Sequence, residues 1–99
     1  MDNYEIVMTP RAHFELEEAF VAILELSASL DIAENYVDSI KNAVDQLSSF
    51  PKRGRIRERG EFAGKGYREI YIKEYTVIYR INEQALQIQI MAIKPSSIK

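Results

Sequence analysis

The chain has 99 residues, a formal net charge of −2 and a composition that is 46% hydrophobic and 10% aromatic. This size and composition predict one folded domain over residues 1–99 with a single core, and they exclude a disordered chain. The absence of cysteine and the single histidine, His13, exclude a disulfide framework, a thiolate zinc site and a histidine-rich metal site. No segment resembles a signal peptide or approaches the ~18 apolar residues of a membrane helix. We therefore expect a cytoplasmic protein with no membrane, metal or cofactor.

The first expected elements are a short strand and a helix. Residues 3–9 (NYEIVMT) alternate apolar and polar side chains, which is the period of a strand. Thr9 and Pro10 then form a favourable helix start, because a hydroxyl caps free N–H groups and proline suits the first helical position. Apolar residues recur every three or four positions over residues 12–26 and predict an amphipathic helix.

A second amphipathic helix follows after a very short connection. Asp31 is expected to cap it, with Glu34 three residues later completing a capping box. Apolar residues recur from Ala33 to Phe50, and Pro51 is expected to end the helix. Because the connection is so short, the two helices must run antiparallel as a helical hairpin.

The charges are segregated along the chain. Residues 12–49 hold eight acidic residues and one base, Lys41. The glycine-containing stretch 51–66 (PKRGRIRERGEFAGKG) is expected to be a loop. Residues 52–68 carry seven bases: Lys52, Arg53, Arg55, Arg57, Arg59, Lys65 and Arg68. Two interpretations stay open, a loop that balances acidic helices or a surface for an acidic or polyanionic partner.

Residues 66–81 (GYREIYIKEYTVIYRI) allow a helix or two strands. Tyrosine recurs every fourth residue, which is a helical spacing, but β-branched residues dominate and favour strands. Two strands broken at Lys73–Glu74 place Arg68 and Ile70 on one face, opposite Tyr71. We therefore predict a hairpin.

A second turn at residues 82–84 and an alternating strand at residues 86–93 (LQIQIMAI) complete the pattern. The predicted order is β-α-α-β-β-β. This is an α+β fold in which the helical hairpin packs on one face of a mainly antiparallel, twisted sheet. The other face is expected to present Tyr, Arg and Gln side chains to solvent or to a partner.

The opening YEIVMTPRAHFELEEAF, the segment LSSFPKRGR, the run GYREIYIKEYTVIYRI and the final LQIQIMAI together resemble the RelE/ParE toxin superfamily of bacterial type II toxin–antitoxin pairs. The resemblance runs over roughly the whole chain and is closer to ParE-like members. It implies a toxin that is neutralised by a cognate antitoxin. The antitoxin's tail would meet the basic groups with carboxylates.

The superfamily has two characterised outcomes. ParE-like members block DNA gyrase, whereas RelE-like members cut mRNA in the ribosome. RelE-like ribonucleases carry an arginine at the position of Thr76, and basic residues with a tyrosine or histidine after the last strand. This chain has Thr76 and ends with Lys94 followed by PSSIK. The resemblance therefore implies gyrase inhibition. The alternatives are a ribosome-dependent endoribonuclease and an inactive interaction module of the same fold.

The candidate site residues follow from these interpretations. If the chain cleaves RNA, the candidates for catalysis are Arg68, Tyr71, Arg80 and Lys94. The candidates for binding the antitoxin or the target are Lys52, Arg53, Arg55, Arg57, Arg59, Lys65, Arg68 and Arg80. Each of these cations could also be ordinary solvated surface, and Tyr71 could be structural.

Overall fold

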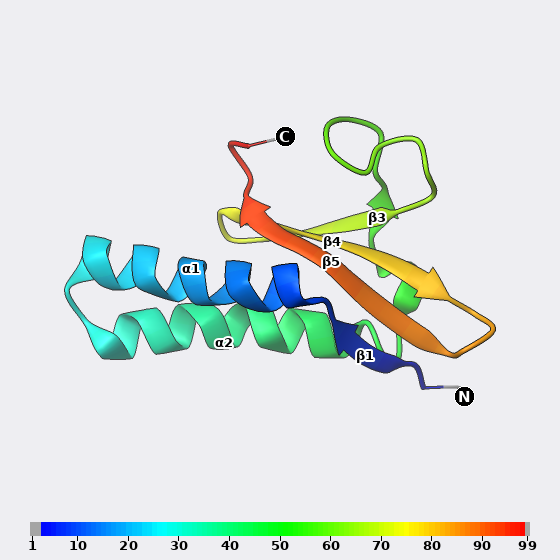
Figure 1. Ribbon diagram of the computed structural model, residues 1–99. Coiled ribbons are helices and arrows are strands. Elements are labelled where there is room, and N and C mark those ends of the chain that lie inside the picture. The colour runs from blue at the N-terminus through cyan, green and yellow to red at the C-terminus, as the bar shows by residue number, and fades with distance from the viewer. Residues whose placement is uncertain (1–2, 99) are drawn as a thin grey trace.

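The computed structural model, which describes residues 3–98, has two helices packed against a five-stranded sheet (Figure 1). The helices are α1 (Pro10–Ser27) and α2 (Leu30–Gln46), and a short 3-10 helix covers Pro51–Arg53. The strands are β1 (Glu5–Met8), β2 (Arg55–Ile56), β3 (Arg68–Ile72), β4 (Tyr75–Asn82) and β5 (Gln87–Pro95). The predicted α+β fold, with a helical hairpin on one face of a mainly antiparallel sheet, is confirmed.

The strands lie in the order β1-β5-β4-β3-β2. β1 runs parallel to β5, and all other neighbours are antiparallel. The earliest strand in the sequence therefore pairs with the latest one. Between Ile78 and Tyr79 the register of β4 against β5 shifts, as in a β-bulge.

The hairpin predicted for residues 66–81 is confirmed. β3 and β4 pair with Ile70 opposite Val77, and Lys73 takes a positive φ of 53° in the turn. Tyr75 and Tyr79 are buried in the core, whereas Tyr71 is exposed on the opposite face. The four-residue spacing of the tyrosines thus belongs to two strands and not to one helical face.

The core lies between the helical hairpin and the sheet. Its fully buried aliphatic side chains include Ile40, Leu47, Val77, Ile88 and Ile90. Each such side chain stabilises the fold by about 1.5–3 kcal/mol relative to an exposed one. In Figure 1 the helices extend well beyond the sheet on the side away from β1, so this end of the hairpin projects from the body of the protein.

The helix boundaries show one confirmed prediction and two errors. Thr9 caps α1, because its Oγ1 accepts a hydrogen bond from the Ala12 N–H. Ser29, and not Asp31, caps α2, since its Oγ accepts from the Ile32 N–H. The predicted capping box of Asp31 and Glu34 was wrong. Ser29 is the last residue with an extended backbone before α2 begins at Leu30, so Asp31 already lies inside the helix. The second error is the extent of α2, which was predicted to continue to Phe50 with an apolar face. The helix ends at Gln46 and a turn follows, so Phe50 is 62% exposed.

The basic stretch and the last strand also differ from their predictions. Residues 51–66 are not only a loop, since β2 pairs with the start of β3. β5 runs to Pro95, so Lys94 lies inside the strand opposite Thr76 rather than beyond it. Both differences bring charged residues onto the sheet face that is turned away from the helices.

Candidate functional site

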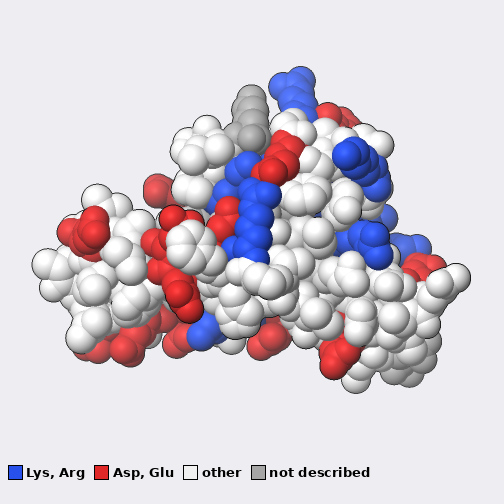
Figure 2. Space-filling model, in the orientation of Figure 1, with Lys and Arg blue, Asp and Glu red and all other residues white. Residues whose placement is uncertain are grey.

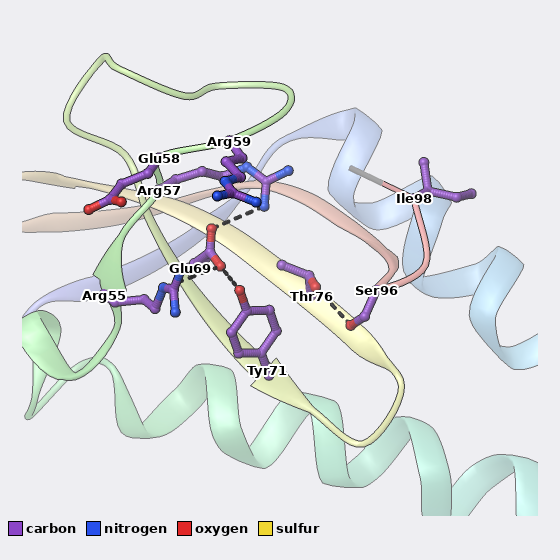
Figure 3. A pocket seen from close by; sticks show the side chains of 9 residues that line it. All are labelled: Arg55, Arg57, Glu58, Arg59, Glu69, Tyr71, Thr76, Ser96 and Ile98. Carbon is purple, nitrogen blue, oxygen red and sulfur yellow. Dashed lines mark hydrogen bonds and ion pairs between the residues drawn. The ribbon is translucent and has the colours of Figure 1, made fainter.

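The sheet face opposite the helices is not an open polar surface, contrary to the sequence-based expectation. Ile78 and Ala92 are fully buried on it, and Thr76 is nearly so. Residues 57–59 of the β2–β3 connection and residues 96–98 after β5 stand beside this face (Figure 3). Together they wall a pocket on the outer side of the sheet.

A buried carboxylate lies on one side of this pocket. Glu69 of β3 is 4% exposed, and Arg57 Nη1 donates to its Oε1 at 3.1 Å. Arg55 Nε lies 3.8 Å from Oε2, and the Tyr71 hydroxyl donates to the same oxygen. This charge pairing compensates part of the cost of removing the ions from water. Sequence reasoning missed Glu69, although a carboxylate inside a predicted strand that follows a run of arginines was a usable signal.

Arg57 ties the β2–β3 connection to the sheet. Its Nε donates to the Glu61 carbonyl oxygen at 2.6 Å, and its backbone N–H donates to the Tyr67 carbonyl oxygen at 2.8 Å. The side chain is 6% exposed. Within residues 3–98, its buried Nη2 has no hydrogen-bond partner. One end of this guanidinium is therefore bound and the other is left unsatisfied.

The pocket has a volume of about 300 Å³ and is mostly polar. Figure 3 shows residues from β2, the connection, β3, β4 and the segment after β5 around it. The lining residues are Arg55, Arg57, Glu58, Arg59, Glu69, Tyr71, Thr76, Ser96 and Ile98. The structure thus gathers three of the predicted partner-binding arginines and Tyr71 at one place.

A pair of hydroxyl groups lies at the position where RelE-like ribonucleases carry an arginine. Thr76 Oγ1 and Ser96 Oγ share a hydrogen bond of 2.8 Å. The Ser96 N–H also donates to the Glu74 carbonyl oxygen, which fixes the segment after β5 against the β3–β4 turn. This wall of the pocket therefore carries neutral groups.

Lys94 belongs to a separate charge network. Its Nζ lies 3.2 Å from Glu61 Oε1, and Arg11 of α1 binds the same carboxylate at 2.6 Å. The hydrogen bond from Arg11 lowers the pKa of Glu61 to about 2 from its ordinary 4.5, and it raises the pKa of Arg11. Glu61 thus holds the connection to α1 and to β5. Sequence reasoning did not single it out.

The start of the basic stretch is fixed by a buried tyrosine. The Tyr79 hydroxyl accepts from the Gly54 N–H at 2.9 Å and donates to the Pro51 carbonyl oxygen at 2.7 Å. Burial raises the pKa of Tyr79, so the hydroxyl stays protonated and able to donate. Arg68 donates to the Gly54 carbonyl oxygen at 2.7 Å from the helix side of the sheet. Arg68 therefore lies away from the pocket.

The remaining basic candidates lie outside the pocket. Lys52, Arg53, Lys65 and Arg80 are all exposed. Arg53 donates to the Gln46 side chain and borders a shallow, mainly apolar depression with Phe50. Figure 2 shows acidic side chains gathered over the helices and basic ones over the opposite half of the visible face. The structure thus divides the predicted basic surface into a pocket and scattered exposed cations.

The helical hairpin exposes large apolar side chains, which the sequence analysis did not anticipate. They are Phe14, Val21, Leu26, Leu30 and Ile32.

No helix within residues 3–98 is long and apolar enough to cross a membrane. In the same part of the chain, no group of three His, Cys, Asp or Glu side chains lies close enough together to hold a metal ion.

The family model of the ParE toxin of the type II toxin–antitoxin system parDE matches residues 6–99. The chain belongs to the ParE toxin family. No curated protein matches its sequence significantly. The resemblance to the RelE/ParE superfamily is therefore confirmed, on the ParE side.

Solved structures share the fold of this ParE-family chain. The chromosomal ParDE toxin–antitoxin system from P. aeruginosa matches with a TM-score of 0.77 and 19% identity, over 97% of each chain. The RelBE2 toxin–antitoxin complex from Mycobacterium tuberculosis matches at 0.63 and 22%, over 96% of this chain and 93% of that one. A mutant of the E. coli toxin RelE in the free state matches at 0.64 and 11%, over 95% and 84%. These identities are low, so the likeness concerns the fold alone.

Proposed function

We propose that this ParE-family toxin inhibits bacterial growth by binding DNA gyrase, without cleaving RNA, and that a cognate antitoxin neutralises it in the cytoplasm. The observation that carries the choice of gyrase is the Thr76–Ser96 hydroxyl pair. It lies on the outer sheet face near the β3–β4 turn, at the position where RelE-like ribonucleases carry an arginine.

RNA cleavage needs a group that activates the 2′-hydroxyl and cations that stabilise the charge developing on the phosphate. Each missing contact of this kind typically lowers the rate by about 10²–10³-fold. Here Thr76 is neutral, Lys94 lies against Glu61, and Arg80 is exposed away from the pocket. These placements favour a toxin that binds its target over one that cuts it.

The exposed cations outside the pocket are the candidates for the target surface. Arg53 lies beside the exposed Phe50, so charge and apolar area are available at one place. Arg80 offers a second exposed cation on β4. Aromatic and arginine side chains dominate the energetics of protein interfaces. This pairing supports a protein target more than a nucleic acid.

The antitoxin is expected to approach through opposite charge and apolar area. Its carboxylates would meet the exposed basic side chains of residues 52–65, and its apolar side chains would cover the exposed residues of the helical hairpin. Association should then slow as salt screens the long-range attraction. Binding that ignores salt would contradict this electrostatic approach.

Tightly controlled expression in bacteria tests the proposed target. We expect growth arrest with altered plasmid supercoiling and a DNA-damage response, while translation is initially intact. Arg53→Ala and Arg80→Ala should weaken the arrest by weakening target binding. Lys41→Ala is the matched control, because it removes an exposed positive charge from α2. Rapid mRNA cuts in phase with codons, lost in an arginine variant, would instead establish the nuclease.

A further inference from the structure

We propose that the outer-face pocket is a binding site for a single carboxylate, supplied by an acidic side chain of the antitoxin, with Arg57 as its principal ligand. The inference rests on the proposed function, because it assigns the carboxylate to the antitoxin. It begins from Arg57 Nη2, a buried guanidinium nitrogen that has no hydrogen-bond partner within residues 3–98.

An unsatisfied buried guanidinium nitrogen is costly, since arginine cannot give up its charge. The other two nitrogens of Arg57 are fixed, Nη1 by Glu69 and Nε by the Glu61 carbonyl oxygen. The guanidinium therefore cannot turn to satisfy Nη2 without breaking a buried contact. A partner that supplies an oxygen acceptor would complete a group that is already oriented, with little loss of side-chain entropy.

The rim of the pocket can both attract an anion and open to it. Arg55 is 66% exposed, and Arg59 and Ile98 are exposed as well. Exposed side chains of this kind change rotamer on a fast timescale, so the rim of the pocket can adjust around an incoming anion. The hydroxyl groups of Tyr71 and Ser96 lie on the same pocket and are further polar neighbours for the ligand.

The charge of the lining identifies the class of anion. Three arginines and two glutamates line the pocket, which gives it a net charge of +1. One carboxylate neutralises this charge. A nucleic-acid strand would bring successive phosphates past Glu58 and Glu69, which would repel them. The balance therefore favours an acidic side chain of a protein over a phosphate backbone.

Titration of the intact toxin with N-acetyl-glutamate amide tests the site, with the arginine side-chain N–H signals followed by NMR. We expect a saturable shift of the Arg57 signals. Arg57→Lys should weaken binding by about tenfold or more, because lysine keeps the charge but cannot present the same fork of N–H donors. Lys41→Arg is the control, as it exchanges the same two cations at an exposed position of α2 outside the pocket, and it should leave binding unchanged.

Two further measurements keep the test decisive. If the amide spectrum of Arg57→Lys shows that the connection has lost its structure, Arg59→Gln on the exposed rim replaces it and should weaken binding severalfold. Inorganic phosphate is titrated in parallel. Phosphate binding that exceeds binding of the glutamate derivative would overturn the carboxylate assignment.

The outcomes separate this inference from the proposed function. If the antitoxin encoded beside the toxin rescues growth but no saturable carboxylate binding is seen, the pocket inference is wrong and the toxin assignment stands. If binding saturates at Arg57 but expression arrests no growth, the carboxylate site stands and the proposed function is wrong. When both hold, Arg57→Lys should also speed dissociation of the antitoxin by about tenfold, and Lys41→Arg should not.

Discussion

Replacing Tyr79 by phenylalanine is expected to lower the free energy of unfolding by about 2–4 kcal/mol. The phenylalanine keeps the buried ring but removes the hydroxyl that joins Gly54 and Pro51. The Gly54 N–H would then be buried without a partner, at a cost of about 1–3 kcal/mol. The Pro51 carbonyl oxygen is only partly buried, and the loss of its hydrogen bond from Tyr79 adds about 1 kcal/mol.

Urea unfolding monitored by circular dichroism measures this change. With a slope of about 1–3 kcal/mol per molar urea, the midpoint should fall by about 0.7–4 M while the slope stays constant. Tyr36→Phe is the matched control. Its hydroxyl accepts from an exposed backbone N–H of Glu74, which water can satisfy, so its effect should stay within about 0.5 kcal/mol.

Limited trypsin digestion adds a local readout. Once the Tyr79 hydroxyl is lost, cleavage after Lys52 and Arg53 should become faster than in the Tyr36→Phe control, because the segment is no longer bonded to β4. A loss of less than 1 kcal/mol with unchanged digestion would refute the reasoning, since it would show that the hydroxyl does not fix the basic stretch to the sheet.

Three other substitutions test further features of the structure. Glu61→Gln should lower the melting temperature at neutral pH. The difference from wild type should shrink as the pH falls from 4.5 towards 2. The pKa of Glu61 is lowered to about 2, so the stabilisation by its carboxylate is lost over that pH range. Ser29→Ala should cost about 1 kcal/mol in urea unfolding and more than Asp31→Ala, because Ser29 caps α2; the reverse order would restore the capping box. Ile88→Ala should cost about 2–5 kcal/mol in the same assay, whereas the exposed Leu26→Ala should stay within about 0.5 kcal/mol, and equal effects would place Ile88 outside the core.

Local sequence signals predicted most of the fold. Thr9 followed by Pro10 marks a helix start within two residues, and the alternation around Lys73–Glu74 specifies both strands and their faces. These features depend on neighbours in the sequence, so composition and spacing are sufficient to find them. The cap of α2 failed because Ser29 and Asp31 are both good capping residues, and only the path of the chain selects between them.

The candidate site was predicted less completely, because it depends on distant contacts. The arginines of residues 55–59 recur at every second position, which is a strand period and could have indicated β2. Nothing in that spacing shows that Arg57 turns inward to Glu69 while its neighbours face solvent. Likewise, the covering of the outer sheet face depends on Glu61 reaching both Arg11 and Lys94, and these three residues lie far apart in the sequence.

The parallel pairing of β1 with β5 makes the closing of the sheet a late event during protein synthesis. Glu5 and Gln87, which face each other in the register, are separated by 82 residues. At about 5–20 residues per second, the ribosome adds β5 roughly 4–16 s after β1. Until then the chain already contains the local contacts of the helical hairpin, but it lacks β5, whose side chains help to bury the apolar side of that hairpin. We therefore expect a newly synthesised chain to expose apolar helix surface before the sheet is complete, and a partner that covers this surface could bind at that stage.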